Sequence, residues 1–271
     1  MSTERVGVIG AGRMGQPMIG HLARRGFDVV AYDLDPAKQE AVTSRGARWA
    51  GTAAALARES SVVLICVGYD AELRQLLSPA GLLPDLSRGT IVAVLSTVHP
   101  RTVQELAAAV TPQGVELVDA TVARGGRSAD AGTLLAFVAG EPPVVERLRP
   151  VLSAFATDIV HTGGVGTAQV AKAANNLVMW SCLIANHEAL ALATRFGVDV
   201  ERLRQALLKS SAENYVLRHW GENTMAWADD DMAIVQAMAR EAGIELPQVD
   251  LNRDLCRALK PKRFKLDEYG V

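Results

Sequence analysis

Residues 5–15, RVGVIGAGRMG, decide the fold of this 271-residue chain. A short β-rich run, Arg5 to Ile9, leads directly into a glycine motif, and Gln16 to Arg25 then has helical character. G-x-G-x-x-G in a strand–turn–helix setting is the fingerprint of a dinucleotide-binding fold. The first glycine makes the turn, the second lets backbone approach a pyrophosphate, and the third lets helix pack on strand. The motif residues expected to bind cofactor are Gly10, Ala11, Gly12, Arg13, Met14 and Gly15.

An acidic residue stands where the adenosine ribose of such a cofactor needs a hydrogen-bond acceptor. A second expected strand, Asp28 to Tyr32, ends at Asp33, about 20 residues after the glycine motif, as the fingerprint requires. A carboxylate accepts from a ribose hydroxyl and repels a 2′-phosphate, and no Arg follows in Leu34 to Pro36. We therefore expect Asp33 to bind the cofactor and NAD to be preferred, with NADP as a possible second cofactor.

The rest of the first half alternates apolar strands with helices. Unbroken apolar runs at Val62–Cys66, Thr90–Val94 and Val115–Ala120 are typical of parallel strands buried on both faces. Further strands are expected at 133–139 and 158–161, with helices at 52–59, 102–110 and 144–155. This alternation predicts an α/β fold with a Rossmann-type, mostly parallel sheet, whose ligands bind at the carboxyl ends of the strands.

Three expected loops lie at those carboxyl ends: 67–70, 96–100 and the segment from Thr121. Val67, Gly68, Ser96 and Thr97 are expected to line the nicotinamide pocket. For Ser96 and Thr97 an alternative stays open, because their hydroxyls could instead cap the helix that follows Pro100.

A long helix follows the sheet, in residues 163–197, GGVGTAQVAKAANNLVMWSCLIANHEALALATRFG. Some 30 residues without Gly or Pro predict a helix of roughly 45 Å, which Gly197 would end. Lys172 and Asn176 are four residues apart and share one face; taken alone, such a lysine is usually a solvated charge. Helices are also expected at 200–209, 215–220, 232–242 and 249–259. We therefore expect a dinucleotide-binding domain at 1–163, and an interdomain helix with an all-helical C-terminal domain at 164–271.

Composition excludes several classes of partner. With 28 basic and 30 acidic residues the net charge is −2, which argues against nucleic acid or an anionic membrane as a partner. Cys66, Cys182 and Cys256 are widely spaced in apolar runs, as expected of reduced thiols in a cytoplasmic protein without a disulfide framework or metal site. Glycines and Arg13 interrupt any signal-peptide core near the start. The expected partners are a small molecule and further copies of the chain, as a homodimer or higher homo-oligomer.

Three segments resemble signatures of the β-hydroxyacid dehydrogenase family, which includes 3-hydroxyisobutyrate dehydrogenases and tartronate semialdehyde reductases. They are Gly10–Gly26 (GAGRMGQPMIGHLARRG), Asp119–Leu134 (DATVARGGRSADAGTL) and Gly163–Asn176 (GGVGTAQVAKAANN). The resemblance keeps the order of the segments and covers nearly the whole chain. It implies a C-terminal domain like that of 6-phosphogluconate dehydrogenase. The catalytic residues would be Lys172, as the catalytic lysine, and Asn176, which helps hold the substrate, with Asn175 as a further substrate-binding residue.

The chemistry of hydride transfer agrees with these roles. Moving hydride between nicotinamide and a carbinol carbon requires a proton to move to or from the oxygen. Lys172 as an ammonium can polarise a carbonyl and protonate the forming alkoxide, and as an amine it can take the proton back. The predicted activity is an NAD(P)-dependent dehydrogenase or reductase for a small, anionic β-hydroxyacid or its aldehyde or keto form.

Two places depart from the family pattern. Where the family has Asp-Ala-Pro-Val-Ser-Gly-Gly, residues 119–125 are DATVARG, so Ala123 replaces a serine and Arg124 replaces a glycine. Ala123, Arg124 and Gly125 are expected to bind substrate, with the Arg124 fork as an anion clamp; alternatively Arg124 is a surface charge or a partner for Asp119 or Asp130. The second departure is at residues 230–232, where DDM replaces Lys-Asp-Leu.

Two other functional classes remain as alternatives. Imine reductases resemble this family in architecture but usually lack the catalytic lysine, so Lys172 favours a hydroxyacid or aldehyde substrate. A non-catalytic dinucleotide-sensing module would keep the glycine motif and need no lysine at 172.

Overall fold

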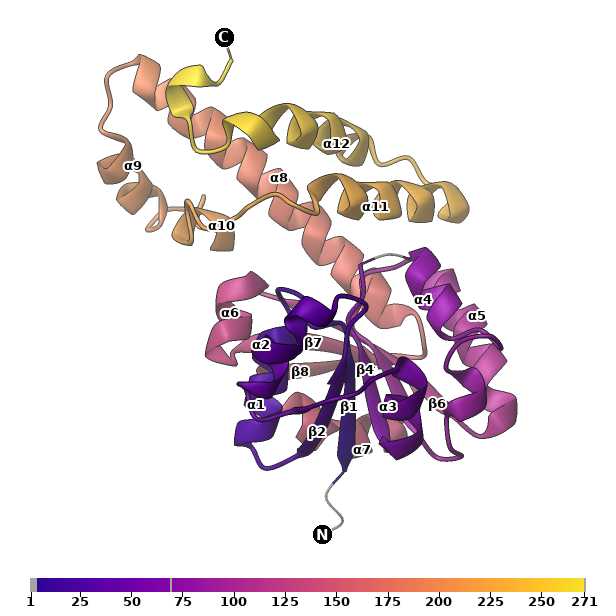
Figure 1. Ribbon diagram of the computed structural model, residues 1–271. Coiled ribbons are helices and arrows are strands. Elements are labelled where there is room, and N and C mark those ends of the chain that lie inside the picture. Colours follow the sequence, from indigo (N-terminus) through magenta and orange to yellow (C-terminus); the bar gives the residue numbers. More distant parts are fainter. Residues whose placement is uncertain (1–3, 69, 271) are drawn as a thin grey trace. The chain divides into compact units, whose positions relative to one another are not determined.

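The computed structural model describes residues 4–68 and 70–270, which form two compact units that divide between Lys172 and Ala173. The first unit is α/β and the second is α-helical (Figure 1). Helix α8, Thr167–Arg195, is continuous through the division. The division falls after the first turns of α8, beyond the expected boundary at 163, because these turns are hydrogen-bonded to strands of the first unit.

The first unit contains an eight-stranded sheet in the order β3-β2-β1-β4-β5-β6-β7-β8. Neighbouring strands are parallel except for β6 and β7, which are antiparallel, so the expected mostly parallel sheet is confirmed. The strands are β1 (Arg5–Ile9), β2 (Asp28–Tyr32), β3 (Arg48–Trp49), β4 (Val62–Ile65), β5 (Ile91–Val94), β6 (Glu116–Ala123), β7 (Leu134–Ala139) and β8 (Ala156–Gly163). The chain reverses its winding between β2 and β4, on either side of β1, which is where doubly wound sheets bind ligands.

Helices cover both faces of this sheet (Figure 1). One face carries α1 (Gly15–Arg24), α2 (Gln39–Thr43), α6 (Gly125–Ala131) and α7 (Pro142–Leu152), and the other carries α3 (Ala53–Glu59), α4 (Asp70–Leu76) and α5 (Pro100–Val110). Because side chains alternate along a strand, Val6 and Val8 pack under α1 while Ile9 joins the core on the opposite face. Short 3-10 turns lie at Pro36–Lys38, Leu83–Asp85 and Thr111–Gln113.

Strand β6 differs most from the sequence expectation. It extends to Ala123, so the loop expected from Thr121 is wrong as far as Ala123. The reason is its antiparallel pairing with β7, in which Ala123 lies opposite Leu135. The expected strands otherwise lie at their predicted places, whereas β3, α2, α4 and α6 were not expected because each is short and without a clear apolar period.

The second unit consists of helices around an apolar core. Besides the rest of α8 it contains α9 (Val200–Leu207), α10 (Tyr215–Arg218), α11 (Ala228–Ala242), α12 (Pro247–Leu259) and the 3-10 turns Lys260–Lys262 and Leu266–Glu268. Helix α11 begins at Ala228 rather than at the expected Met232, because three aspartates in its first turn suit the positive end of a helix. The core includes Trp180, Leu183 and Met232.

Helix α8 ends as its sequence predicts. Gly197 adopts φ 71°, and the N–H groups of Gly197 and Val198 donate to Thr194 (3.1 Å) and Ala193 (3.0 Å), which closes the last turn. By length and composition α8 could also cross a membrane, but the core helix of a soluble protein passes the same test, so this feature is weak evidence.

His187, in the second half of α8, is fully buried among the aromatic rings of Trp220, Phe264 and Tyr269. Its Nε2 accepts a hydrogen bond from the Phe264 N–H at 2.9 Å, and its Nδ1 has no partner. Burial lowers the pKa of His187 to about 4. The imidazole is therefore neutral at pH 7 and holds the C-terminal segment of the second unit.

Candidate active site

The glycine motif forms the turn between β1 and α1. Gly10 has φ 99°, and a Cβ there would lie 2.1 Å from the Cys66 carbonyl oxygen, while a Cβ at Gly15 would lie 1.9 Å from the Gly10 oxygen. These two glycines are required by the protein's own packing. A Cβ at Gly12, in contrast, would meet nothing within 4 Å. The space at Gly12 therefore suits the close approach of a pyrophosphate, which is the role predicted for it.

The N-terminus of α1 is open to an anion. Its N-cap, Met14, makes no side-chain capping bond, and the first turn has no acidic residue. Backbone N–H groups at such an end bind phosphate. Within the motif, the Ala11 N–H donates to Asp33, and the Arg13 side chain extends to Asp130.

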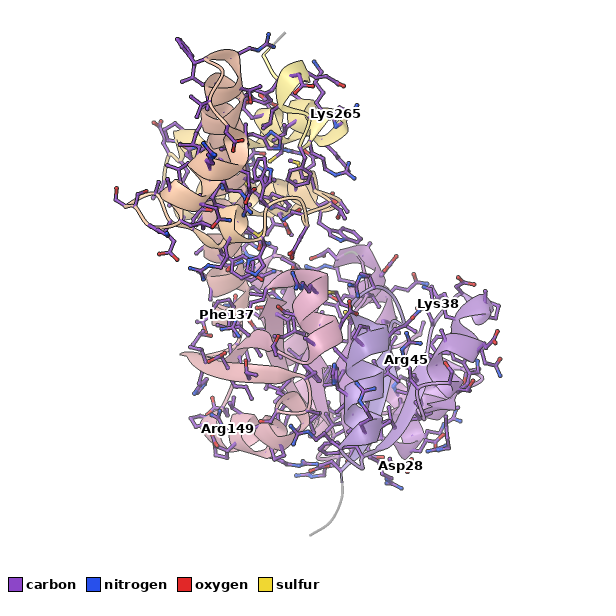
Figure 2. The ribbon with its side chains drawn as sticks, turned by 90° about the vertical axis from the view of Figure 1, so that its left-hand side faces the viewer. Asp28, Lys38, Arg45, Phe137, Arg149 and Lys265 are labelled. Carbon is purple, nitrogen blue, oxygen red and sulfur yellow. The ribbon has the colours of Figure 1, made fainter. Side chains whose placement is uncertain are left out.

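Asp33 lies directly after β2 with its side chain only 11% exposed. Its Oδ2 accepts from the Ala11 N–H (2.7 Å), its Oδ1 accepts from the Asp35 N–H (2.9 Å), and both oxygens lie 3.0 Å from Lys38 Nζ. Burial raises the pKa of Asp33, but these hydrogen bonds outweigh it and hold the pKa below its ordinary value. Asp33 is thus held as a carboxylate, as expected of a residue that binds the ribose, and Lys38, labelled in Figure 2, is a cation beside it that was not expected from the sequence.

The loops after β4 and β5 are tied together by Ser96. Its hydroxyl accepts from the Val67 N–H and donates to the Val67 carbonyl, both at 2.9 Å. The Gly68 N–H donates to Glu72 at 3.0 Å. Ser96 and Thr97 do not cap the following helix, because the N-cap of α5 is His99, whose Nδ1 accepts from the Arg101 N–H. The capping alternative is therefore wrong, and Ser96 instead fixes the edge of the expected nicotinamide pocket.

The start of α8 is hydrogen-bonded to the middle of β6. Asp119, fully buried, accepts from the N–H groups of Gly166 (2.8 Å) and Gln169 (3.0 Å). Burial raises the pKa of Asp119, and the two N–H donors act in the opposite direction. A carboxylate at a helix N-terminus satisfies N–H groups that have no partner within the helix.

Two further side chains complete this connection. The Gln169 side chain accepts from the Val98 N–H (3.0 Å) and donates to the Ser96 carbonyl (2.9 Å). The Thr121 hydroxyl donates to the Ala168 carbonyl at 3.0 Å. Gln169 and Thr121 are buried, so the start of α8 has a fixed position on β5 and β6.

Lys172 lies one turn further along α8 than Ala168. Its Nζ donates to the Val122 carbonyl at 2.8 Å, and the residue is half-buried. This contact places the ammonium at the carboxyl end of β6, next to Ala123, which is 6% exposed. The predicted catalytic lysine and the predicted substrate segment are therefore brought together.

Arg124 adopts a left-handed conformation, with φ 80°. Its Nη1 donates to Asp158 (2.7 Å), Thr157 (3.1 Å) and the Thr133 carbonyl (3.1 Å), and this bonding lowers the pKa of Asp158. Asp158 was not among the alternative partners considered, which were Asp119 and Asp130. Arg124 would have to leave its pair with Asp158 to clamp a substrate anion. The family glycine at this position is explained by the left-handed backbone, which favours glycine. Gly125, next in the chain, begins α6 with φ 74°.

The remaining predicted residues belong to the second unit. Asn175 Nδ2 donates to Asn176 Oδ1 at 3.0 Å, and Asn176 is 2% exposed. Because α8 is continuous, Asn176 lies one helical turn after Lys172. At the second departure from the family, Asp231 accepts from the Trp180 Nε1–H at 2.9 Å, so this aspartate stabilises the helical unit itself.

The sequence analysis missed three contributors to the site: Asp119 as the anchor of α8, Gln169 as the bridge to β5, and Lys38 beside Asp33. For Asp119 a signal existed, because a carboxylate inside an apolar run must find partners when buried. For Gln169 and Lys38 the pairings depend on the tertiary structure. All three cysteines are free thiols. Within residues 4–68 and 70–270, no group of three or more His, Cys, Asp or Glu side chains could hold a metal ion.

Comparison with known proteins gives matches to both units. Residues 5–164 match the family model for the NAD binding domain of 6-phosphogluconate dehydrogenase. Residues 166–268 match that for the NAD-binding region of NADP-dependent 3-hydroxyisobutyrate dehydrogenase. The two models together span nearly all the described chain and agree with the open helix end and the space at Gly12.

Individual relatives agree with these models. The chain is 29% identical over 255 residues to a 2-(hydroxymethyl)glutarate dehydrogenase of Eubacterium barkeri, covering 90% of this chain and 85% of that protein. It is 32% identical over 213 residues to a 3-hydroxyisobutyrate dehydrogenase of Pseudomonas aeruginosa, covering 78% of this chain and 72% of that protein. The solved structure of a Mycobacterium tuberculosis 3-hydroxyisobutyrate dehydrogenase with L-serine has the same fold, with a TM-score of 0.87 at 23% identity over 96% of this chain and 95% of that one. This chain belongs to the β-hydroxyacid dehydrogenase family, the NAD(P)-dependent oxidoreductases that transfer hydride on the CH–OH group of small hydroxyacids.

Proposed function

We propose that the chain interconverts a small anionic β-hydroxyacid and its aldehyde or keto form, with Lys172 as the general acid and base. The observation that carries this proposal is the position of Lys172, whose Nζ lies 2.8 Å from the Val122 carbonyl at the carboxyl end of β6. The nicotinamide, when bound, accepts or delivers the hydride.

The protein's own residues then handle the proton. In the reducing direction the Lys172 ammonium donates a hydrogen bond to the carbonyl oxygen and transfers its proton as the C–O bond becomes an alcohol. In the oxidising direction the neutral amine takes the hydroxyl proton while hydride leaves the carbon. The Val122 carbonyl accepts from Nζ and so fixes the direction of the ammonium, and Asn176 holds the substrate oxygen one helical turn away.

We infer that NAD is preferred over NADP. The support is Asp33, which is held as a carboxylate at the ribose position by hydrogen bonds from Ala11 and Asp35. Equal or higher kcat/KM with NADP would contradict the preference.

The substrate proposal is tested by turnover of NADH with a panel of short aldehyde and keto acids, run against matched imines. Turnover confined to carbonyl acids supports it, turnover confined to imines points to the imine reductase alternative, and tight NADH binding without any turnover points to a sensing module. Lys172 favours the first outcome, because imine reductases usually lack this lysine.

We further propose a homo-oligomer in the cytoplasm. Its support is the exposure of apolar side chains on and after α8, where Leu192 is 61% and Phe196 79% exposed, and the presence of three free thiols. Light scattering on the purified chain tests the oligomer, and a monomeric mass would contradict it.

A further inference from the structure

Arg13 occupies a variable position of the glycine motif, and its side chain makes a two-point contact with α6. Its Nη1 donates to Asp130 Oδ1 at 2.8 Å and its Nη2 donates to Asp130 Oδ2 at 2.6 Å. These hydrogen bonds raise the pKa of Arg13 and lower that of Asp130. A bidentate pair of this kind fixes the geometry of both partners, because the planar guanidinium matches the carboxylate.

The same guanidinium also covers the backbone at the start of α6. A Cβ at Gly126 would lie 2.6 Å from Arg13 Nη2, 2.7 Å from its Cζ and 2.9 Å from its Nε. A side chain at 126 would therefore displace the Arg13 guanidinium from this position. Arg13 thus contacts both ends of α6, through Gly126 and Asp130.

A second side chain of α1 holds the C-terminal end of α6. His21 Nε2 lies 3.1 Å from the Ala129 carbonyl and 3.0 Å from the Asp130 carbonyl, and its Nδ1 lies 2.9 Å from Arg24 Nη2. Because arginine has no acceptor atom, Nδ1 must accept and Nε2 must carry the proton. His21 therefore donates to the last carbonyls of α6.

Helix α6 depends on these contacts. Its sequence, GGRSADA, begins with two glycines, and only Ala129 is buried. Glycine is among the poorest helix formers, and a seven-residue helix is not stable by itself. Besides the buried Ala129, the side chains of Arg13 and His21 hold α6 against α1.

The position of α6 matters because of what precedes it. Residues 122–125 connect the Lys172 contact at Val122 to the first residue of α6. This stretch contains Ala123, Arg124 and Gly125, which are predicted to bind substrate. Its two ends are therefore fixed by Lys172 on one side and by α6 on the other.

We propose that Arg13 is a positioning residue for substrate binding, which ties the substrate segment, residues 123–125, to the dinucleotide loop through its pair with Asp130. The inference rests on the proposed function for the role of that segment. Arg13 was predicted to bind cofactor as part of the glycine motif; the proposal assigns its side chain a different role, since the fork is already committed to Asp130. The dinucleotide loop and the substrate segment are then held in a fixed position relative to each other.

Variants at the two residues of the pair distinguish a positioning role for Arg13 from a role in binding the cofactor. We compare Arg13→Met, Asp130→Asn and the double variant by the Kd for NADH and by kcat and KM for the best substrate found. If Arg13 is a positioning residue, either single change raises KM about five- to twentyfold and affects KM more than kcat. The KM of the double variant should be no higher than that of the more impaired single variant, because both changes break the same ion pair. The Kd for NADH stays within about threefold, since the space at Gly12 and the open end of α1 are unaltered.

If Arg13 instead binds the pyrophosphate, Arg13→Met weakens NADH binding at least about tenfold, while Asp130→Asn leaves it unchanged or strengthens it by releasing the guanidinium. That opposite response of the two variants would overturn the proposal. Arg48→Met is the matched control, because Arg48, on the edge strand β3, is a similarly exposed arginine that forms ion pairs with Glu59 (2.8 Å) and Asp28 (3.4 Å). Arg48→Met should leave the Kd for NADH and the KM for the substrate unchanged.

Hydrogen exchange of residues 124–132 provides a readout that needs no substrate. Amide exchange in this segment should become about tenfold faster in Arg13→Met and in Asp130→Asn, while β1 and β4 keep wild-type protection, which also shows that the variants are folded. Wild-type exchange rates in both variants would contradict the proposal that the Arg13–Asp130 pair holds this segment, even if no substrate were found. Faster exchange in an enzyme with no turnover would contradict only the proposed function.

Discussion

Replacing Asp119 with Ala tests how the sheet positions the catalytic helix. Asp119 accepts from two N–H groups at the start of α8, and hydrogen bonds to a charged group contribute about 1.5–3 kcal/mol each. The cost of burying the carboxylate, visible in its raised pKa, offsets part of that sum. We expect Asp119→Ala to lower the free energy of unfolding by about 2–4 kcal/mol.

The measurement is urea unfolding followed by circular dichroism, with kcat measured on the same samples. With a slope of about 2 kcal/mol per molar urea, the midpoint should fall by about 1–2 M. Asp119→Asn should lie between Ala and wild type, because its amide oxygen can accept one N–H while its NH₂ faces the other. Loss of kcat should accompany the unfolding change, since Lys172 lies one turn further along the helix.

The matched control is Asp70→Ala, which removes an exposed aspartate paired with Arg74 on α4. It should change the free energy of unfolding by less than about 1 kcal/mol. If Asp119→Ala unfolds at the wild-type urea concentration and keeps wild-type kcat, the account of how α8 is held is wrong.

Three other changes have defined outcomes. Arg124→Gly should leave substrate KM within about twofold, because relief of the left-handed backbone accompanies loss of the Asp158 pair; a tenfold rise in KM would make Arg124 a substrate ligand. Lys38→Met should shift the ratio of kcat/KM about tenfold further towards NAD, because it removes the cation beside Asp33 that could meet a 2′-phosphate; an unchanged ratio would exclude Lys38 from cofactor choice. His187 has a folded-state pKa of about 4 against an ordinary 6.5, so the unfolded chain takes up its proton first as pH falls. The contribution of neutral His187 to the free energy of unfolding is therefore complete above pH 6.5, and about 3 kcal/mol of it is lost by pH 4. Urea unfolding at both pH values should show this loss for the wild type, and it should be absent in His187→Gln.

The alternating pattern of the first half was enough to predict its strands, apart from the two-residue β3. Val62–Ile65 and Ile91–Val94 are buried on both faces, and the apolar runs that cover them have the length and composition of central parallel strands. The extension of β6 to Ala123 could not be predicted in this way, because it depends on antiparallel pairing with β7, a contact between separate segments. The short helix α6 was not predicted because the side chains that hold it in place, Arg13 and His21, lie in a distant part of the sequence.

The site residues likewise divide into those with a local sequence signal and those whose partners lie in distant segments. The roles of Gly10 and Gly15 are steric requirements of one local turn, so a motif within six residues predicts them. The partner of Arg124 could not be predicted, because Asp158 lies on a distant strand and the local sequence offered Asp119 and Asp130 as equally reasonable partners. Lys38 was not predicted for a related reason: the cation expected to meet a 2′-phosphate is an arginine close to Asp33, and Lys38 is a lysine five residues further along the chain.

The central claim, that Lys172 moves the proton, is tested most directly by kcat for Lys172→Ala with the best carbonyl acid found. The account predicts a fall of roughly 10²–10⁴ in kcat, the contribution of a positioned acid or base, with the Kd for NADH within about twofold of wild type because the glycine motif is untouched. Lys209→Ala, which removes an exposed lysine after α9, is the control and should match wild type in both constants. A kcat for Lys172→Ala within threefold of wild type would contradict the account.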